Sequence, residues 1–358
     1  MGYQLTVITP VYNISEHLPR FFESMSRQTF RDFRLLLLDD GSQDDSLKVC
    51  RDFAEKDSRV TVVASEHMGV TAIKTKALEY IETPFTAYAD GDDYVEPDYL
   101  MHLMDAQKKY DADLVISRVQ YQLENGAIEG AFPERGEMLI TRDEFKEKIP
   151  LLLDDRRLNY LYAKVYRSSL LTDIRIPDDV RQGSDTMTNF TFIKNASTIV
   201  LIDDLDYHYT RYSIRSVTSY NGEESFNRIN RINRFVYDSC KETGLLTEEM
   251  LSVIDKRVLL SAVWSSEKIM ASDIGDDVKA RRITEMLHDD FYLSSYERQQ
   301  KRTTAPGFEI IQPQDGAVFL KNKQKAEEKQ KRKAQILSKT PRFVVNLYHK
   351  LKGVPSEG

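Results

Sequence analysis

The sequence predicts an α/β fold, with a mostly parallel central sheet carrying helices on both faces, followed by an all-α region. Two observations support this prediction. In the first half of the 358-residue chain, short apolar runs typical of buried strands alternate with segments whose apolar residues recur at helical spacing. From Ser225 to about Met286 the spacing is helical and amphipathic, with little strand signal. Strands joined through helices pair in parallel, because the chain crosses back over a face of the sheet between them.

The elements follow in order from the N-terminus. Leu5–Thr9 is a short β-favouring run closed by Pro10, and Ile14–Gln28 follows with apolar residues at helical spacing. Phe33–Leu38 is a second buried-type strand, because its apolar residues form a nearly continuous run. The alternation continues through Asp45–Glu55 (helix), Val60–Val63 (strand), Val70–Ile81 (helix), Pro84–Ala89 (strand), Leu100–Tyr110 (helix) and Asp113–Val119 (strand).

The rest of the chain is less regular. Tyr121–Glu137 contains glycine and is expected to form a hairpin or an exposed loop, whereas Thr141–Leu153 has helical spacing. Three further segments continue the first domain: Leu161–Tyr166, Thr186–Ile193 and Ser197–Ile202. We therefore expect three regions: a first domain at residues 1–220, a helical domain at 221–320 and a basic amphipathic tail at 321–358.

Composition limits the compartment and the class of partner. The net charge of −7 argues against a protein that mainly binds nucleic acid. Two cysteines cannot build a disulfide framework and fit a reducing compartment. The N-terminus lacks the pattern of a signal peptide, and no apolar run approaches the roughly 18 residues needed to span a bilayer. We therefore expect a cytoplasmic protein.

Positive charge is concentrated near the C-terminus. Between Lys321 and Lys352, 11 Lys and Arg stand against two Glu, a net of about +9, so the rest of the chain is near −16. Arg342–Leu351 places apolar residues on one helical face beside basic residues, as interfacial helices do. The arm is either a solvated helix or a binding segment for an anionic polymer or lipid. We expect it to attach the protein peripherally to the inner face of the cell membrane.

Two acidic clusters, D-D-G-S at Asp39–Ser42 and D-G-D-D at Asp90–Asp93, each follow a predicted strand. In open α/β sheets, ligands bind at the carboxyl ends of the strands, so both clusters are expected at the rim of one site. Two carboxylates one residue apart can divide the work there, because one can hold a sugar hydroxyl while the other binds a hard divalent cation. Such a D-x-D pattern is also typical of a solvated acidic turn.

Three motifs in order carry a resemblance to a known family. V-I-T-P-V-Y-N at Val7–Asn13 precedes the D-D-G-S and D-G-D-D clusters, and each motif follows a predicted strand. The combination resembles the family 2 glycosyltransferases, which have a GT-A fold. The resemblance covers roughly residues 4–220 and is strongest over residues 4–119.

The resemblance implies roles for the matching positions. Pro10 and Tyr12 would line the pocket for the nucleotide base and ribose, and Asp40 would face the base. Asp90 would reach the ribose of the nucleotide. Asp92 would bind Mg²⁺ or Mn²⁺, the cofactor expected for this family.

One stretch departs from the family pattern. Many relatives carry N-x-G-x-x-x-A-R-N-x-G, whereas His67–Ala77 reads H-M-G-V-T-A-I-K-T-K-A. Lys74 stands at the arginine position and can still meet a phosphate as a point charge, without bidentate geometry. We therefore expect Lys74 to bind the nucleotide sugar, and His67, at the asparagine position, to be structural.

Inverting sugar transfer needs a general base for the acceptor hydroxyl. In relatives this base lies in an E-D pair before a short helix. Here the segment is R-Q-G-S-D-T-M-T-N-F, in which Ser184 replaces the glutamate and Asp185 matches the aspartate. Asp185 is therefore the expected base, with a helix N-cap as its alternative role. Asp178 and Asp179 are weaker candidates for the base.

A later segment resembles the loop that closes over the diphosphate in these enzymes. It reads Y-H-Y-T-R-Y-S-I-R-S-V-T at Tyr207–Thr218. Arg211, Arg215 and Ser216 are expected to hold phosphate oxygens. His208 is either a metal ligand or an ordinary strand histidine.

The sequence therefore predicts an inverting, metal-dependent glycosyltransferase. It would move a sugar from a nucleotide diphosphate sugar, with UDP-sugar favoured by the resemblance, to a hydroxyl of a cell-surface glycan or wall polymer, including lipid-linked acceptors. The helical region would contact the acceptor or form an oligomer interface. A non-catalytic scaffold that binds the nucleotide sugar is the alternative, motivated by Lys74 and Ser184. A nucleotidyltransferase would need a glycine-rich, basic loop after the first strand, and T-P-V-Y-N is not one.

Overall fold

A computed structural model describes residues 2–177, 179–180, 183–212, 222–302 and 310–339. The chain divides into two compact units. The first comprises the chain up to residue 220 together with residues 227–258, and the second comprises residues 221–226 and the chain from residue 259 onward. Part of the helical region thus belongs to the same unit as the first 220 residues, whereas the division into domains at residue 220 remains a prediction.

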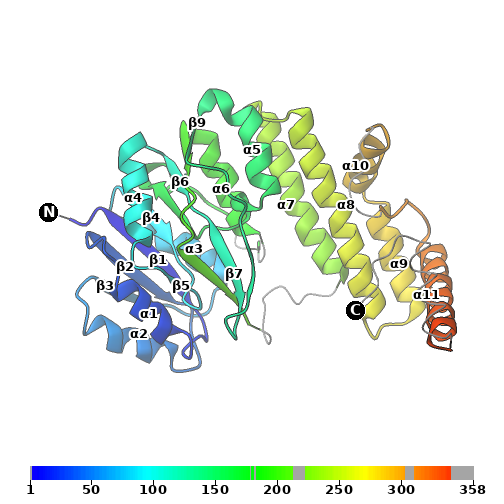
Figure 1. Cartoon of the computed structure of the whole chain (residues 1–358), viewed down its shortest axis with the longest axis horizontal. Helices are drawn as coiled ribbons and strands as arrows, with labels where there is room; N and C mark the ends of the chain where they lie inside the picture. Colours follow the sequence, from blue (N-terminus) through cyan, green and yellow to red (C-terminus); the bar gives the residue numbers. More distant parts are fainter. Residues whose placement is uncertain (1, 178, 181–182, 213–221, 303–309, 340–358) are drawn as a thin grey trace. The chain divides into compact units, whose positions relative to one another are not determined.

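The first unit is built on an eight-stranded sheet with the order β3-β2-β1-β4-β10-β6-β11-β9. Figure 1 labels the strands β1, β2, β3, β4, β6 and β9 of this sheet. The strands β3, β2, β1 and β4 are parallel to one another, as are β6 and β11, while β10 and β9 run antiparallel to their neighbours. The bounds are β1 Leu5–Val11, β2 Phe33–Asp39, β3 Val60–Ala64, β4 Phe85–Tyr88, β6 Leu114–Ile116, β9 Met138–Thr141, β10 Lys164–Arg167 and β11 Thr198–Leu201. The predicted α/β fold with a mostly parallel sheet is confirmed.

A second sheet has four strands in the order β5-β12-β7-β8. Its strands are β5 Tyr94–Val95, β7 Val119–Leu123, β8 Ile128–Ala131 and β12 Tyr207–Arg211. The strands β7 and β8 pair antiparallel, so the segment predicted to be a hairpin or a loop contains a hairpin. The pairing of β12 with β5 brings the chain after residue 206 against the segment that follows the D-G-D-D motif.

Apolar spacing predicted the helices before residue 155 and those between residues 222 and 287, whereas the helix at residues 184–195 was implied only by the family resemblance and those at 290–300 and 316–339 were not predicted. Those before residue 200 are α1 Leu18–Ser26, α2 Ser46–Ala54, α3 Val70–Ala77, α4 Tyr99–Tyr110, α5 Phe145–Asp154 and α6 Ser184–Asn195. Those after it are α7 Gly222–Thr243, α8 Glu248–Ala271, α9 Asp276–Leu287, α10 Asp290–Gln300 and α11 Gly316–Lys339. Within the described residues from 222 onward every regular element is a helix, which confirms the predicted all-α region.

The core of the first unit surrounds the parallel strands. The apolar residues Leu35–Leu38 of β2 are at most 1% exposed, although successive side chains of a strand point to opposite faces. Both faces of β2 are therefore covered, which is why its sequence is a continuous apolar run rather than an alternating one. The rigid strands hold the loops at their carboxyl ends in place.

No helix among the described residues is long and apolar enough to cross a bilayer. The predicted interfacial segment Arg342–Leu351 lies outside the described residues, which end at Lys339 of α11. The attachment of the tail to a membrane remains a prediction.

Candidate active site

Three strand ends meet at one edge of the main sheet. In the β1–β2 pair Val11 lies opposite Asp39, and in the β1–β4 pair Ile8 lies opposite Tyr88. The backbone N–H of Asp40 donates to the carbonyl of Val11 at 2.8 Å, which extends the first pairing. The chain segments that follow β1, β2 and β4 therefore emerge side by side, as expected for the carboxyl ends of parallel strands.

A cavity of about 640 Å³ opens at this edge. Its volume lies within the range typical of small-molecule sites in proteins. Six of the residues singled out from the sequence line it: Pro10, Tyr12, Asp40, Lys74, Asp90 and Asp92. These residues are separated by up to 82 positions in the chain, so the fold brings together the motifs that the sequence places apart.

Asp40 holds the loop that precedes α3. Its side chain accepts hydrogen bonds from the backbone N–H groups of Met68 at 2.8 Å and Gly69 at 2.9 Å, and Nδ1 of His67 lies 3.0 Å from its Oδ2. The residue is only 3% exposed. The ring of His67 in turn stacks on Tyr12, with centroids 4.3 Å apart. Asp40 thus shapes the cavity wall through the loop that it anchors.

The glycine of D-G-D-D permits a close approach between this loop and α1. A Cβ atom on Gly91 would lie 2.8 Å from Cδ1 of Ile14 and 3.1 Å from Cδ2 of Leu18. A side chain at this position would have to displace the ends of these two side chains. The absence of a side chain at Gly91 therefore allows the turn to pack closely on Ile14 and Leu18, with Asp90 and Asp92 lining the cavity.

Asp93 points away from the cavity and anchors the loop. Its Oδ2 accepts a hydrogen bond from the hydroxyl of Tyr207 at 2.8 Å, and its Oδ1 accepts one from the backbone N–H of Thr210 at 2.8 Å. The Tyr207 oxygen also accepts from the backbone N–H of Asp90 at 3.0 Å. Burial, reinforced by the charges of Asp92 and Asp90, raises the pKa of Asp93 well above its usual value. Strand β12 thereby fixes the conformation of the D-G-D-D turn.

Arg20 is a neighbour of this turn that no sequence motif marked. Its guanidinium donates to the carbonyl oxygen of Asp92 at 3.0 Å and to Oγ1 of Thr210 at 2.9 Å. The hydroxyl of Tyr212 donates to the same carbonyl at 2.9 Å, and its ring stacks on His17. Helical spacing indicated only that Arg20 lies off the apolar face of α1, and it did not indicate which element faces it.

The two cavity carboxylates share an excess of negative charge. Burial raises the pKa of Asp90 to about 6; the charge of Lys74 opposes this shift, and the charges of Asp92 and Asp185 add to it. Burial also raises the pKa of Asp92, although the charges of Arg20 and Lys74 work against it. Oxygen donors with uncompensated negative charge suit a hard divalent cation, so these residues fit the expected Mg²⁺ or Mn²⁺.

Lys74 and Asp185 form an ion pair from two different helices. Nζ of Lys74, on α3, lies 2.9 Å from Oδ1 of Asp185, in the first turn of α6. The N-cap of α6 is Gly183, and the helix has no side-chain cap, so the alternative role of Asp185 as an N-cap is wrong. A Cβ atom on Gly183 would lie 1.9 Å from Cδ1 of Ile232, so α7 packs directly on the start of α6.

Arg211, the one other predicted phosphate ligand that the structure describes, does not line the cavity. Arg211 ends β12, has 61% of its side chain exposed, and pairs with Glu129 of β8. Arg215 and Ser216 lie outside the described residues, as does Asp178. Asp179, the other weaker candidate for the base, pairs with Arg231 of α7 at 2.8 Å and is not a cavity residue.

His208 has protein partners on both ring nitrogens. Nε2 lies 2.8 Å from Oε1 of Glu96, and Nδ1 lies 3.1 Å from Nε2 of Gln120. The ring also stacks on Tyr94 at 4.4 Å. These contacts are those of a buried strand histidine, the second of the two roles considered for it.

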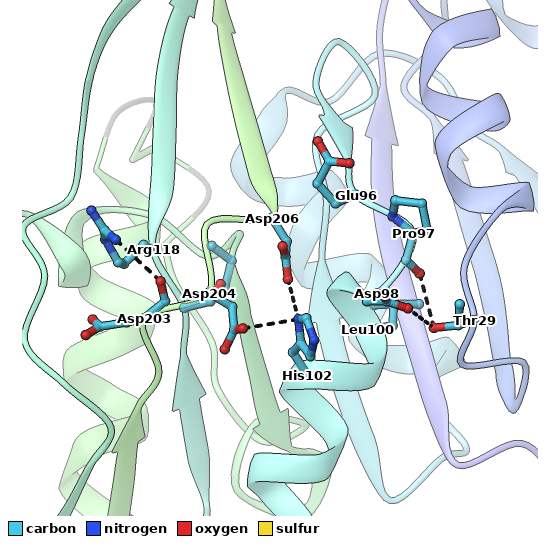
Figure 2. Close-up of polar contacts among 12 residues, drawn as sticks. Thr29, Glu96, Pro97, Asp98, Leu100, His102, Arg118, Asp203, Asp204 and Asp206 are labelled. Carbon is cyan, nitrogen blue, oxygen red and sulfur yellow. Dashed lines mark hydrogen bonds and ion pairs between the residues drawn. The ribbon is translucent and has the colours of Figure 1, made fainter.

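A separate acidic cluster surrounds His102 of α4. Its Nδ1 lies 2.7 Å from Oδ2 of Asp206 and 3.3 Å from Oδ1 of Asp204. Figure 2 draws both contacts as dashed lines. In the described part of the chain this is the one group of three His, Cys, Asp or Glu residues whose ligand atoms lie close enough to share a metal ion. Burial lowers the pKa of His102, but the bond to Asp206 and the charges of the two aspartates outweigh burial and raise it. None of the three lines the cavity.

Comparison with known proteins identifies the domain that carries the cavity. Residues 6–171 match the model of the family "Glycosyl transferase family 2". These residues form a family 2 glycosyltransferase domain. The resemblance inferred from the three motifs is therefore confirmed.

Two bacterial proteins are similar to this chain. The chain is 22% identical over 207 residues to "Uncharacterized glycosyltransferase EpsJ" of Bacillus subtilis, spanning 57% of this chain and 60% of that protein. It is 24% identical over 239 residues to "Poly(ribitol-phosphate) beta-N-acetylglucosaminyltransferase TarS" of Staphylococcus aureus, spanning 64% of this chain and 39% of TarS. The chain thus matches less than two thirds of the length of either relative.

The fold has a solved counterpart. The crystal structure of S. aureus TarS 1–349 in complex with UDP-GlcNAc superposes with a TM-score of 0.61, covering 82% of this chain and 81% of that one. The sequences are 17% identical in this comparison, so the likeness concerns the fold. It confirms the GT-A architecture expected from the motifs.

Proposed function

We propose that this protein is an inverting, metal-dependent glycosyltransferase. It moves a sugar from a nucleotide diphosphate sugar, with UDP-sugar preferred, to a hydroxyl of a cell-surface glycan or wall polymer. The observation that carries the proposal is the cavity at the strand ends of a family 2 domain, which six of the predicted site residues line. The TarS structures with UDP-GlcNAc and with UDP support the choice of nucleotide, because they share this fold.

Each wall of the cavity has a proposed task in donor binding. Pro10 and Tyr12 receive the base and ribose, and Asp40 acts on the base through the loop that it anchors. Asp90 accepts a hydrogen bond from a ribose hydroxyl. Lys74 contributes positive charge on the side where the diphosphate would lie.

Asp92 is the proposed ligand of Mg²⁺ or Mn²⁺. Its carboxylate faces the cavity, while its carbonyl oxygen is fixed by Arg20 and Tyr212. Asp90 and Asp92 carry an excess of negative charge, and this excess favours binding of a cation from solution. When bound, the metal ion would neutralise charge on the diphosphate as it leaves. Arg211, Arg215 and Ser216 remain candidates for phosphate contacts when the donor is bound.

Asp185 is the proposed general base. Its Oδ1 pairs with Lys74, and its Oδ2 makes no hydrogen bond within the described residues. Oδ2 can therefore take the proton of the acceptor hydroxyl. The acceptor oxygen then bonds to the anomeric carbon while the bond from that carbon to the diphosphate oxygen breaks, with inversion at the anomeric carbon.

The segments that follow the glycosyltransferase domain have proposed partners of their own. The basic tail would bind an anionic membrane surface on the cytoplasmic side, close to acceptors that include lipid-linked polymers. The helical region would contact the acceptor or mediate self-association. A non-catalytic protein that only binds the nucleotide sugar is a second candidate, because Lys74 and Ser184 depart from the family pattern.

Isothermal titration with UDP tests the donor site. Wild-type protein should bind UDP more tightly with Mn²⁺ than without it, and Asp92→Ala should abolish the metal-dependent part of binding. Asp105→Ala, which removes an exposed carboxylate of α4, is the matched control and should behave as wild type. If UDP, CDP, GDP and dTDP all fail to bind with Mn²⁺, the proposed function is wrong.

A transfer assay separates the two candidates. UDP-sugars that bind are incubated with glycan or polymer acceptors, and release of UDP is measured. Release that Asp185→Asn reduces supports the enzyme. Tight binding with no release from any donor, with or without acceptor, supports the scaffold.

A further inference from the structure

Lys74 lies between two parts of the site that the proposed function uses at different moments. It lines the large cavity together with Asp90 and Asp92. It also lines a smaller recess together with Asp185 and Tyr88. A single ammonium group thus borders both the donor cavity and the carboxylate proposed as the base.

The contact with Asp185 is direct and sheltered. The Nζ–Oδ1 distance is 2.9 Å, and the two side chains are 13% and 18% exposed. Neither solvent nor salt screens such a pair as it would an exposed one. The pair also joins α3 to the first turn of α6, so it helps to fix the rotamer of the Asp185 side chain.

The charges around Lys74 make its position responsive to ligands. Burial lowers the pKa of Lys74, but the charges of Asp185, Asp90 and Asp92 outweigh burial and raise it, so the group stays an ammonium. One positive charge therefore faces three carboxylates from two sides. A diphosphate in the cavity adds further negative charge on one of these sides, and a lysine stem is flexible enough to turn toward it.

We propose that Lys74 is a positioning residue that couples the donor cavity to Asp185. With the cavity empty, its ammonium pairs with Asp185; with a nucleoside diphosphate bound, the ammonium turns toward the phosphates. The carboxylate of Asp185 then loses its counterion, and its Oδ2 accepts a proton more readily than it does in the ion pair. This inference rests on the proposed function, because it assumes a diphosphate in the cavity.

A thermodynamic consequence follows for binding. Asp185 and the diphosphate compete for one lysine, so removing Asp185 should tighten diphosphate binding. Removing any negative charge near the cavity would also tighten binding through space. The two effects differ in one respect: competition requires Lys74, whereas the through-space effect does not.

A double-mutant cycle on UDP binding with Mn²⁺ separates these effects. The four proteins are wild type, Asp185→Asn, Lys74→Met and the double variant, and isothermal titration gives each Kd. Asp185→Asn should tighten binding about five- to tenfold in the wild-type background and less than twofold in the Lys74→Met background. Glu66→Gln removes an exposed charge beside His67, a cavity residue, and should have the same small effect in both backgrounds.

Three outcomes are decisive. A coupling of the expected size supports the inference, and Lys74→Arg, which keeps the charge, should retain part of it. Equal effects of Asp185→Asn in both backgrounds would overturn the inference and leave the proposed function standing. If wild type fails to bind UDP, CDP, GDP or dTDP with Mn²⁺, the proposed function fails and the inference fails with it.

Circular dichroism melts guard against misfolding. Lys74→Met leaves Asp185 without its partner and is the variant most at risk. Asp185→Asn and Lys74→Arg keep a polar group at each position. If Lys74→Met does not fold, Lys74→Gln, which removes the charge and keeps a polar group, takes its place in the cycle, and an Asp185→Asn effect that Lys74→Gln leaves unchanged contradicts the inference.

Discussion

Lys164 is a buried lysine that should control part of the pH dependence of stability. It lies on β10, is 1% exposed, and donates from Nζ to the carbonyl oxygens of Tyr160 at 2.6 Å and Tyr162 at 3.2 Å. Burial lowers its pKa from 10.5 to about 7; the charge of Asp185 opposes this shift, and that of Arg157 adds to it. The folded protein therefore holds this proton more weakly than the unfolded chain does.

The size of the effect follows from these two pKa values. Because the unfolded state binds more protons between pH 7 and pH 10.5, the free energy of unfolding rises with pH across this window. Each pKa unit corresponds to about 1.36 kcal/mol. Integrating from about pH 7 to about pH 9, where Lys164 is neutral in the folded state, gives an increase of about 2 kcal/mol.

The variant Lys164→Met removes the titrating group and keeps most of the apolar stem. The carbonyl of Tyr160 still accepts a bond from Nδ2 of Asn189 at 2.9 Å. Urea unfolding is followed by circular dichroism at about pH 7, 8 and 9. Between the two ends of this range, the free energy of unfolding should rise by about 2 kcal/mol more in wild type than in Lys164→Met.

Controls make the comparison specific. Lys146→Met, which removes an exposed lysine of α5, should follow wild type. The buried thiols Cys50 and Cys240 titrate in all three proteins, so their contribution cancels in the difference. Parallel profiles for wild type and Lys164→Met would refute the reasoning, because they would mean that Lys164 keeps its proton equally in the folded and unfolded states.

Three further predictions concern the D-G-D-D turn and α4. Burial raises the pKa of Asp90 to about 6, so metal-dependent UDP binding should weaken about tenfold for each pH unit below that value. Asp90→Asn should lose this pH dependence. If titration calorimetry shows that the variant keeps it, Asp90 is not the group responsible. Gly91→Ala should lower both the melting temperature and the UDP affinity, since its Cβ would meet Ile14 at 2.8 Å; unchanged values would show that the loop has room. The raised pKa of His102 stabilises the fold below the usual value of 6.5, and this contribution is lost as pH rises through the folded-state pKa. His102→Asn should therefore melt below wild type near pH 5.5 and close to it near pH 9, and equal melting at both would exclude this role.

Much of the donor site could be predicted because its residues sit in local patterns. Strand β2 reads as a continuous apolar run, and D-D-G-S begins where that run ends. Parallel pairing then places the carboxyl ends of β1, β2 and β4 at one edge whatever the details of the packing. Asp40, Asp90 and Asp92 were located by this rule alone, although their roles in binding remain to be tested.

The remaining parts of the site depend on contacts between distant segments. Helical periodicity indicates which face of α1 is apolar, but it does not reveal that Arg20 meets the turn at Asp92. Nor does any local pattern join Asp93 to Tyr207, which lie 114 positions apart. These contacts depend on the pairing of β12 with β5, which is a property of the folded domain.

The sequence by itself determined the fold class, the alternation of the main strands and helices up to about residue 119, and the edge of the sheet where carboxylates gather. Hydrophobic periodicity and strand-end motifs depend on residues close together in the sequence, so they can be read without knowing the tertiary contacts. Only the tertiary structure decided that Lys74 pairs with Asp185, 111 positions away, and that Gly183, not Asp185, caps α6. Those facts depend on how α3, α6 and α7 pack together, because side-chain distances between helices are set by the fold and not by either helix alone.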